Sequence, residues 1–145
     1  MTVYLDTNVL VAASVKDHPH YVPAFDLLKS VKHATVKGCI STHGLAEFYS
    51  VLTRAPFIPR IHPAEADRFL EDNILPHFEL VTLSPNDYKA VLRACAKAGL
   101  VGGVVFDVLH LHSARKAGCE RIYTFNVKDF RALATSELQD KISAP

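Results

Sequence analysis

Four acidic residues spread along the chain have the side chains needed to hold a divalent metal ion: Asp6, Glu47, Asp107 and Asp129. Carboxylates that lie close together repel one another unless a cation neutralises them, and oxygen ligands of this kind suit Mg²⁺ or Mn²⁺. An ion held in this way lowers the pKa of water, orients a phosphodiester and stabilises its leaving oxygen. If the fold brings the four acids together, the predicted chemistry is hydrolysis at phosphorus.

Two of these acids are expected beside the ends of parallel strands. Asp6 directly follows the β-prone stretch 2–5, and Asp129 lies in the segment after the strand-like stretch 121–125. Ligands gather outside the carboxyl ends of the strands in open parallel sheets, so both carboxylates are expected at the same edge. Each acid also has a purely structural interpretation, as a residue at the start of the helix that follows it.

The other two acids are expected on helices. Glu47 borders the apolar face of a helix that begins near Thr42, where a solvated surface glutamate is the alternative. Asp107 shares a helix face with Leu111 and Ala114, so its carboxylate is expected to point inward at the start of a helix over residues 107–117. A buried acid needs a partner, and capping of that helix accounts for the position only in part.

Smaller polar residues accompany the acids. Asn8 is expected to hydrogen-bond Asp6 or nearby backbone, with a helix-start cap as the alternative. Thr124 and Asn126 lie in the same loop as Asp129, the amide serving as a neighbour of the ligands. Histidines are given less weight.

Asp107 and His110, three residues apart on one helix, could together bind a transition metal ion, but hard oxygen ligands predominate among the candidates. His43 and the other histidines near helix starts are expected at the surface or as caps.

Short strands alternating with helices must position these residues. Strands are predicted at 2–5, 36–41, 79–83 and 121–125, with an optional edge strand at 141–143. Helices are predicted to follow Asp6, over 21–31, after Thr42, from Pro63, from Pro85, over 107–117 and over 127–133. This alternation predicts parallel β-α-β units, with a sheet covered by helices on both faces.

Composition limits the kind of protein further. A length of 145 residues with 49% hydrophobic residues predicts one domain over 1–145 with a single substantial core. The apolar runs are far shorter than the ~20 residues of a membrane helix, and the first residues lack a basic leader, so a soluble cytoplasmic protein without a membrane partner is expected. The three cysteines (Cys39, Cys95 and Cys119) form no Cys-x-x-Cys pair and are interpreted as reduced core residues.

The charge balance favours a local hold on nucleic acid over general binding. The net charge of +1 is uninformative in itself, because nucleic-acid modules are often strongly basic but a nuclease needs only a local basic track. Lys128 and Arg131 flank Asp129, and Arg115 and Lys116 close the helix of Asp107, so either pair is a candidate for phosphate contacts. Ordinary solvated charges are the alternative.

The acids and their surroundings resemble the PIN-domain family, and within it the VapC-type toxins of type II toxin-antitoxin systems. The resemblance covers almost the whole chain. It is carried by Leu5-Asp6-Thr7-Asn8-Val9-Leu10, Ala46-Glu47-Phe48, Asp107 at its helix start, and Tyr123-Thr124-x-Asn126-x-x-Asp129-Phe130.

The resemblance implies a fold and a function. The fold is a PIN-like three-layer α/β/α sandwich with a central, mainly parallel sheet of four to five strands. The function is a homodimeric endoribonuclease that needs Mg²⁺ or Mn²⁺, cleaves RNA, and is inhibited by a cognate VapB-like antitoxin binding over the active site. None of this follows from composition.

The resemblance also assigns residues. Asp6, Glu47 and Asp107 match the family's metal-site acids, and Thr124 matches a hydroxyl residue near that site. Many relatives have aspartate where this chain has Asn126, so either Asp129 supplies the fourth carboxylate or the site has three. One metal ion or two remain open.

Three rival functions are weighed. An aspartate-based phosphohydrolase of the haloacid-dehalogenase type requires a second acid two residues after Asp6, where this chain has Asn8. A receiver-like signalling module requires a phospho-acceptor after a middle strand and a lysine after a later one, and neither is found. A non-catalytic PIN-like regulatory or binding protein is favoured only by Asn126.

Overall fold

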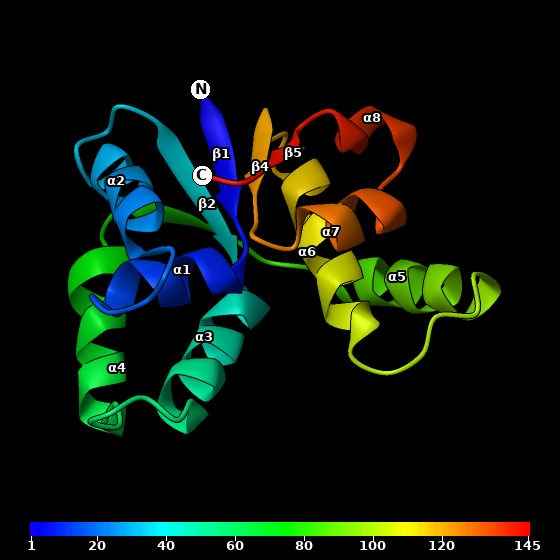
Figure 1. The fold of residues 1–145 in the computed structure, drawn as a ribbon. Helices are drawn as coiled ribbons and strands as arrows, with labels where there is room; N and C mark the ends of the chain where they lie inside the picture. The colour runs from blue at the N-terminus through cyan, green and yellow to red at the C-terminus, as the bar shows by residue number, and fades with distance from the viewer.

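The computed structural model describes residues 1–145, and its strands form one parallel sheet (Figure 1). The strands are β1 (Thr2–Leu5), β2 (Lys37–Ser41), β3 (Phe78–Val81), β4 (Arg121–Tyr123) and β5 (Ile142–Ser143). Their order is β3-β2-β1-β4-β5, and every neighbouring pair is parallel. The predicted α/β fold with a central parallel sheet is confirmed.

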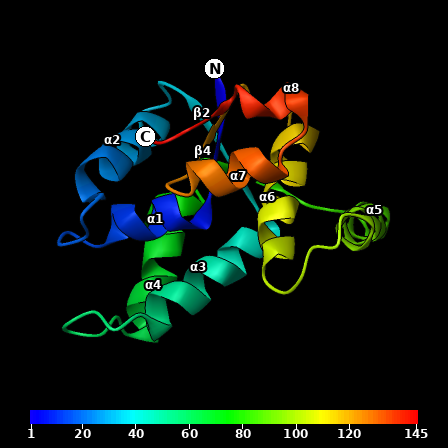
Figure 2. The same cartoon turned by 45° about the vertical axis from the view of Figure 1, so that its right-hand side comes forward.

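Helices connect the strands and cover both faces of the sheet. They are α1 (Thr7–Ser14), α2 (Tyr21–Lys32), α3 (Thr42–Arg54), α4 (Pro63–Phe69), α5 (Pro85–Lys97), α6 (Val104–Lys116), α7 (Val127–Leu133) and α8 (Ser136–Gln139). A π-helical turn, η1 (Leu70–Ile74), continues α4. In Figure 1, α1, α2 and α4 lie to one side of the sheet and α5 to α8 to the other, and the turned view in Figure 2 keeps this separation.

The alternation of side chains along the central strand explains the two layers. Val3 and Leu5 belong to a core formed with α1, α2 and α3, whereas Tyr4 points to a second core formed with α6 and α7. Successive side chains of a strand point to opposite faces, so a strand buried on both faces is apolar at every position. The short run Val3-Tyr4-Leu5 therefore anchors both layers, and all three residues are fully buried.

The strand order sets the position of the crevice. From β1 the chain moves to β2 and β3 on one side and later returns to β4 and β5 on the other, so the direction of winding reverses between β1 and β4. The backbone N–H of Asp6 donates to the carbonyl of Tyr123 at 2.9 Å, which extends this ladder one residue past β1. Ligands of open parallel sheets bind at such a reversal, beyond the carboxyl ends of the strands.

The predicted start of one helix was wrong. Helix α6 begins at Val104, so Asp107 lies in its first turn and does not open it. The backbone N–H of Phe106 already donates to the carbonyl of Gly103 at 3.1 Å, so the helix starts directly after the glycine pair Gly102-Gly103. Gly102 has φ +69°, a conformation that favours glycine. The short helix α8 was not predicted, and Leu70 and Ile74, which were assigned to the helix from Pro63, lie in the π-helical turn η1.

Two further observations bear on the composition. Cys39, Cys95 and Cys119 are all buried and free, as interpreted from their apolar surroundings. None of the helices combines the length and the apolar composition that a membrane crossing requires.

Candidate active site

Asp6 is the buried centre of the polar residues at the crevice, with 3% of its surface exposed. Its Oδ2 accepts a hydrogen bond from the hydroxyl of Thr124 at 2.8 Å, and its Oδ1 lies 3.4 Å from Nε2 of His110. Burial raises the pKa of Asp6, more than His110 and Thr124 lower it. The carboxylate makes no capping hydrogen bond to α1, so Asp6 does not serve as a side-chain cap of that helix.

The loop after β4 fixes the hydroxyl that orients Asp6. Thr124 is fully buried, and its Oγ1 accepts hydrogen bonds from the backbone N–H of Asn126 at 3.0 Å and from Nδ2 of Asn8 at 3.4 Å. Oδ1 of Asn8 in turn accepts from the backbone N–H of Phe125 at 3.3 Å. Asn8 therefore reaches Asp6 through Thr124 and not directly, and Asn126 contributes its backbone to the network.

Helix α3 brings Glu47 to the same place. Ser41 caps this helix by accepting from the N–H of Gly44 at 3.0 Å. One oxygen of Glu47, Oε2, is buried without a hydrogen-bond partner and lies 3.3 Å from Nε2 of His110 and 3.7 Å from Nε2 of His43. Burial by itself raises the pKa of Glu47, but the two imidazoles outweigh it and hold the pKa below its ordinary value.

Asp107 is influenced by the charges of the other three acids. Its pKa is raised from 3.8 to about 6, mainly by burial and then by the negative charges of Asp6, Glu47 and Asp129, while His110 acts in the opposite direction. Asp129 is exposed, in the first turn of α7. Asp107 is therefore close enough to the other three acids for their charges to act on it, although the four come from separate segments.

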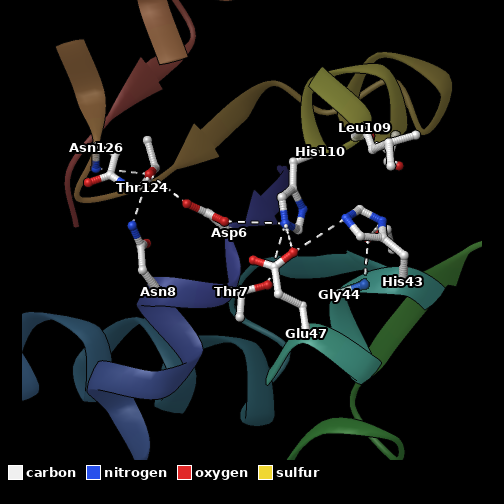
Figure 3. A network of polar contacts seen from close by, with 12 residues as sticks. Asp6, Thr7, Asn8, His43, Gly44, Glu47, Leu109, His110, Thr124 and Asn126 are labelled. Atoms are coloured by element: carbon white, nitrogen blue, oxygen red, sulfur yellow. Dashed lines mark hydrogen bonds and ion pairs between the residues drawn. The ribbon is translucent and has the colours of Figure 1, made fainter. Parts of the chain in front are cut away.

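His110 lies at the centre of the network in Figure 3. The sequence analysis ranked it below the acids. It is fully buried on α6, and its Nδ1 is hydrogen bonded to the hydroxyl of Tyr4 at 2.7 Å. Burial alone lowers its pKa, but contact with Glu47 and the charges of Asp6 and Asp107 outweigh that and raise it. A sequence signal existed, because His110 lies one helical turn after Asp107 on an inward-facing helix.

His43 was expected at the surface or as a cap, and that expectation was wrong. Its side chain is 13% exposed, Ser41 caps the helix instead, and the hydroxyl of Ser41 is hydrogen bonded to Nδ1 of His43 at 2.7 Å. Burial and then the charge of His110 lower its pKa from 6.5 to about 4. The spacing of four residues between His43 and Glu47, one turn of the same helix, is the signal that could have revealed it.

The residues fit a divalent cation. A buried carboxylate oxygen without a hydrogen-bond partner, on Glu47, is costly unless something positively charged approaches it. The mutual repulsion that raises the pKa of Asp107 is relieved by the same positive charge. The donors are carboxylates, which are the ligands that Mg²⁺ and Mn²⁺ prefer.

Comparisons with known proteins give the chain a family. The PIN domain model matches residues 3–135. Ribonuclease VapC40 of Mycobacterium tuberculosis is 30% identical over 132 residues, which cover 91% of this chain and 90% of that protein.

Two solved structures share the fold. The structure of VapC20 from M. tuberculosis, described as a sarcin-ricin loop cleaving toxin, has a TM-score of 0.71 at 18% identity and covers 93% of this chain and 97% of its own. VapBC2 from Rickettsia felis, bound to a DNA fragment from its promoter, has a TM-score of 0.61 at 22% identity, covering 91% and 92%. At these identities both structures support the fold alone. Because the family model matches nearly the whole chain and a relative of 30% identity spans most of it, the chain belongs to the PIN-domain family.

Proposed function

We propose that this protein is a metal-dependent endoribonuclease that hydrolyses RNA phosphodiester bonds and serves as the toxin of a toxin-antitoxin pair. One observation carries the proposal most directly. Asp6 and Glu47, from the first and second β-α units, both lie within 3.4 Å of one buried nitrogen of His110, and their charges raise the pKa of Asp107. Membership of the PIN-domain family and a relative named as a ribonuclease support the same activity.

The metal ligands in this proposal are Asp6, Glu47, Asp107 and Asp129, and the ion is Mg²⁺ or Mn²⁺. When bound, the ion supplies positive charge to the scissile phosphate and lowers the pKa of the attacking water. Thr124 holds Asp6 in one orientation by its hydrogen bond, so this carboxylate needs no reorganisation when the ion arrives. Asp129 supplies the carboxylate that Asn126 does not, because Asn126 contributes only its backbone N–H to the network.

Lys128 is the basic residue that we assign to the RNA backbone. It is exposed on α7, next to Asp129. The other three candidates have partners within the chain. The guanidinium of Arg131 donates to the carbonyl of Ile142 at 2.8 Å, Lys116 donates to Asp87, and the guanidinium of Arg115 lies 3.4 Å from Nδ1 of His112. One free cation beside Asp129 agrees with a weak local hold on the phosphates.

Partners and assembly complete the proposal. We propose that the 145-residue chain acts in the cytoplasm as one PIN-like domain, forms a homodimer, and is inhibited by a VapB-like antitoxin. The structural neighbour that contains a VapBC2 assembly is the support for an antitoxin. Light scattering on the purified chain tests the dimer, and a monomer at micromolar concentration contradicts it. Family membership removes the haloacid-dehalogenase and receiver alternatives.

RNA cleavage is the direct test of the activity. Purified protein is incubated with a structured RNA in Mg²⁺, in Mn²⁺ and in EDTA, and cleavage is expected with either ion and not with the chelator. Asp107→Asn is expected to lower cleavage by more than about 100-fold, because loss of outer-sphere partners alone costs 10–100-fold. Asp67→Asn, an exposed acid on α4, is the matched control and should cleave normally. Intact RNA with both ions favours a non-catalytic PIN-like protein.

A further inference from the structure

Two histidines, which the proposed nuclease chemistry does not use, form a cluster with Glu47, one of the four acids. One ligand atom from each of His43, Glu47 and His110 lies within 4.8 Å of the other two. Figure 3 shows the two imidazoles and the carboxylate converging from α3 and α6. We propose that His43, Glu47 and His110 form a binding site for a divalent transition metal ion of the zinc class, which shares Glu47 with the oxygen-ligand site.

The distances suit such an ion with little movement. Oε2 of Glu47 lies 3.3 Å from Nε2 of His110 and 3.7 Å from Nε2 of His43. Zinc bonds of roughly 2.0–2.2 Å to nitrogen and oxygen put the ligand atoms of a tetrahedral site roughly 3.4 Å apart. Two histidines and one carboxylate are three protein ligands, which leaves a fourth position for water or a substrate oxygen.

Each imidazole is held in the orientation that a ligand needs. Nδ1 of His110 is hydrogen bonded to the hydroxyl of Tyr4 at 2.7 Å, and Nδ1 of His43 to the hydroxyl of Ser41 at 2.7 Å. Metal-bound histidines generally have such a partner on the other ring nitrogen, which fixes the ring and the tautomer. In both rings the nitrogen left to face Glu47 is Nε2.

Two of the three ligand atoms lack any other partner. Nε2 of His43 and Oε2 of Glu47 are both buried and make no hydrogen bond. Buried polar atoms are nearly always paired, so two orphaned atoms facing each other need an explanation. A positive ion between them bonds to both.

The local charges suit a cation. Nε2 of His43 makes no hydrogen bond, so its lone pair has no other partner in the structure. The carboxylates of Asp6 and Glu47 lie 3.4 Å and 3.3 Å from Nε2 of His110 and attract a divalent ion. Imidazole nitrogen selects zinc-class ions over Mg²⁺, so this position differs in preference from the four acids.

The sequence leaves room for the hydrogen-bond partner of His43. A Cβ atom at Gly44 would lie 3.4 Å from Cε1 of His110 and 3.0 Å from Oγ of Ser41. The closest of these contacts is with Ser41, so glycine at this position leaves room for the hydroxyl that is hydrogen bonded to His43. His43 and Glu47 flank it on the same helix.

Cobalt and zinc binding test the inference without any RNA. Wild-type protein is titrated with Co²⁺ and read by its visible absorption, and with Zn²⁺ by calorimetry. One equivalent should give intense cobalt bands, and His43→Ala should lose them and bind zinc at least tenfold more weakly. The matched control is His33→Ala, which removes an exposed histidine. Equal zinc affinity in the two variants, or no cobalt bands in wild-type protein, overturns the inference.

A measurement on wild-type protein keeps the test valid if His43→Ala does not fold. In ¹⁵N NMR, one equivalent of Zn²⁺ should shift the Nε2 signals of His43 and His110 and leave that of His33 in place. Shifts confined to other histidines overturn the proposal. The ribonuclease proposal is judged separately, because RNA cleavage with Mg²⁺ but no cobalt bands removes only this site, and cobalt bands without cleavage remove only the nuclease.

Discussion

The hydroxyl of Thr124 makes three hydrogen bonds at the crevice, one of them to Asp6. It donates to Asp6 and accepts from two N–H groups, so its hydrogen-bonding capacity is fully used in a buried position. A hydroxyl fixed from both sides holds the carboxylate that it contacts in one orientation. The orientation of Asp6 therefore depends on one side chain 118 residues further along the chain.

Removing this hydroxyl should reduce activity by weakening the hold on Asp6. Thr124→Val keeps the shape of the side chain and is expected to lower RNA cleavage by about 10-fold or more, since outer-sphere partners of metal ligands contribute about that much. Thr124→Ser keeps the hydroxyl and should retain most of the activity. Single-turnover cleavage at saturating Mg²⁺ compares the two. Equal rates for valine and serine would show that the hydroxyl has no such role.

The pKa of Asp107 predicts a stability that depends on pH in metal-free protein. A folded-state pKa of about 6 against an ordinary 3.8 means that folding disfavours the charged carboxylate, so stability falls as the pH rises from about 4 to about 6. Asp107→Asn should therefore be more stable than wild type in EDTA at pH 7.5. About 1 kcal/mol is expected, because water screens a half-exposed group.

The same comparison at low pH provides the control. At pH 4 the wild-type carboxyl is already neutral, so the difference between Asp107→Asn and wild type should disappear. Urea unfolding at both pH values measures it. A variant that is less stable at pH 7.5, or equally stabilised at both pH values, contradicts the electrostatic origin of the shift.

Strand β2 depends on close packing under α2 and beside β3. Gly38 is its second residue, and a Cβ atom there would lie 2.7 Å from Cγ1 of Val31 and 2.7 Å from Cε1 of Phe78. Both neighbours are buried and have little room to move. The strand that leads to α3, and so to Glu47 and His43, is thus set in place by a residue without a side chain.

Gly38→Ala should destabilise the protein by about 1–3 kcal/mol, the usual cost of forcing an extra methyl group into a packed core. Gly103→Ala is the matched control, because no heavy atom lies within 4 Å of its added Cβ and its φ is −65°. That variant should change stability by less than about 0.5 kcal/mol. Thermal unfolding compares the two, and similar losses would mean that the contact at Gly38 relaxes freely.

The complete site exists only when the whole sheet is assembled. One of its acids directly follows β1, and the others come from α3, α6 and α7, which are separated along the chain. The site lies at the reversal between β1 and β4. An ion bound by them binds the folded chain and not the unfolded one. Metal binding must therefore add to the stability of the entire fold.

Magnesium should stabilise the wild-type chain against unfolding. At a free Mg²⁺ concentration a hundred times the Kd, the free energy of unfolding is expected to rise by about 3 kcal/mol over that in EDTA. Glu47→Gln should lose most of this gain, whereas Glu71→Gln, an exposed acid in η1, should keep it. Urea unfolding with and without the ion measures the difference. If Mg²⁺ stabilises Glu47→Gln as much as it stabilises the wild-type chain, Glu47 is not a ligand of this ion.

The sequence alone determined the parts of this protein that depend on local pattern. The alternation of strands and helices, the bounds of β1 and α7, and the placement of Asp6 directly after a strand could all be read from periodicity and from breaks in it. The fourth strand was predicted two residues too long, since β4 ends at Tyr123 and leaves Thr124 just beyond it. The resemblance of the surrounding motifs to a family then selected the acids. Where local signals were weak, as at the glycine pair before Val104, the predicted boundary was wrong.

Tertiary structure alone decided which side chains meet. Tyr4 and His110 are 106 residues apart, and their contact depends on β1 lying between β2 and β4 with α6 packed over that face. No local pattern encodes strand order, because it follows from the burial of both sheet faces by the whole chain. For the same reason the convergence of His43, Glu47 and His110 on one point appears only after α3 and α6 have packed together.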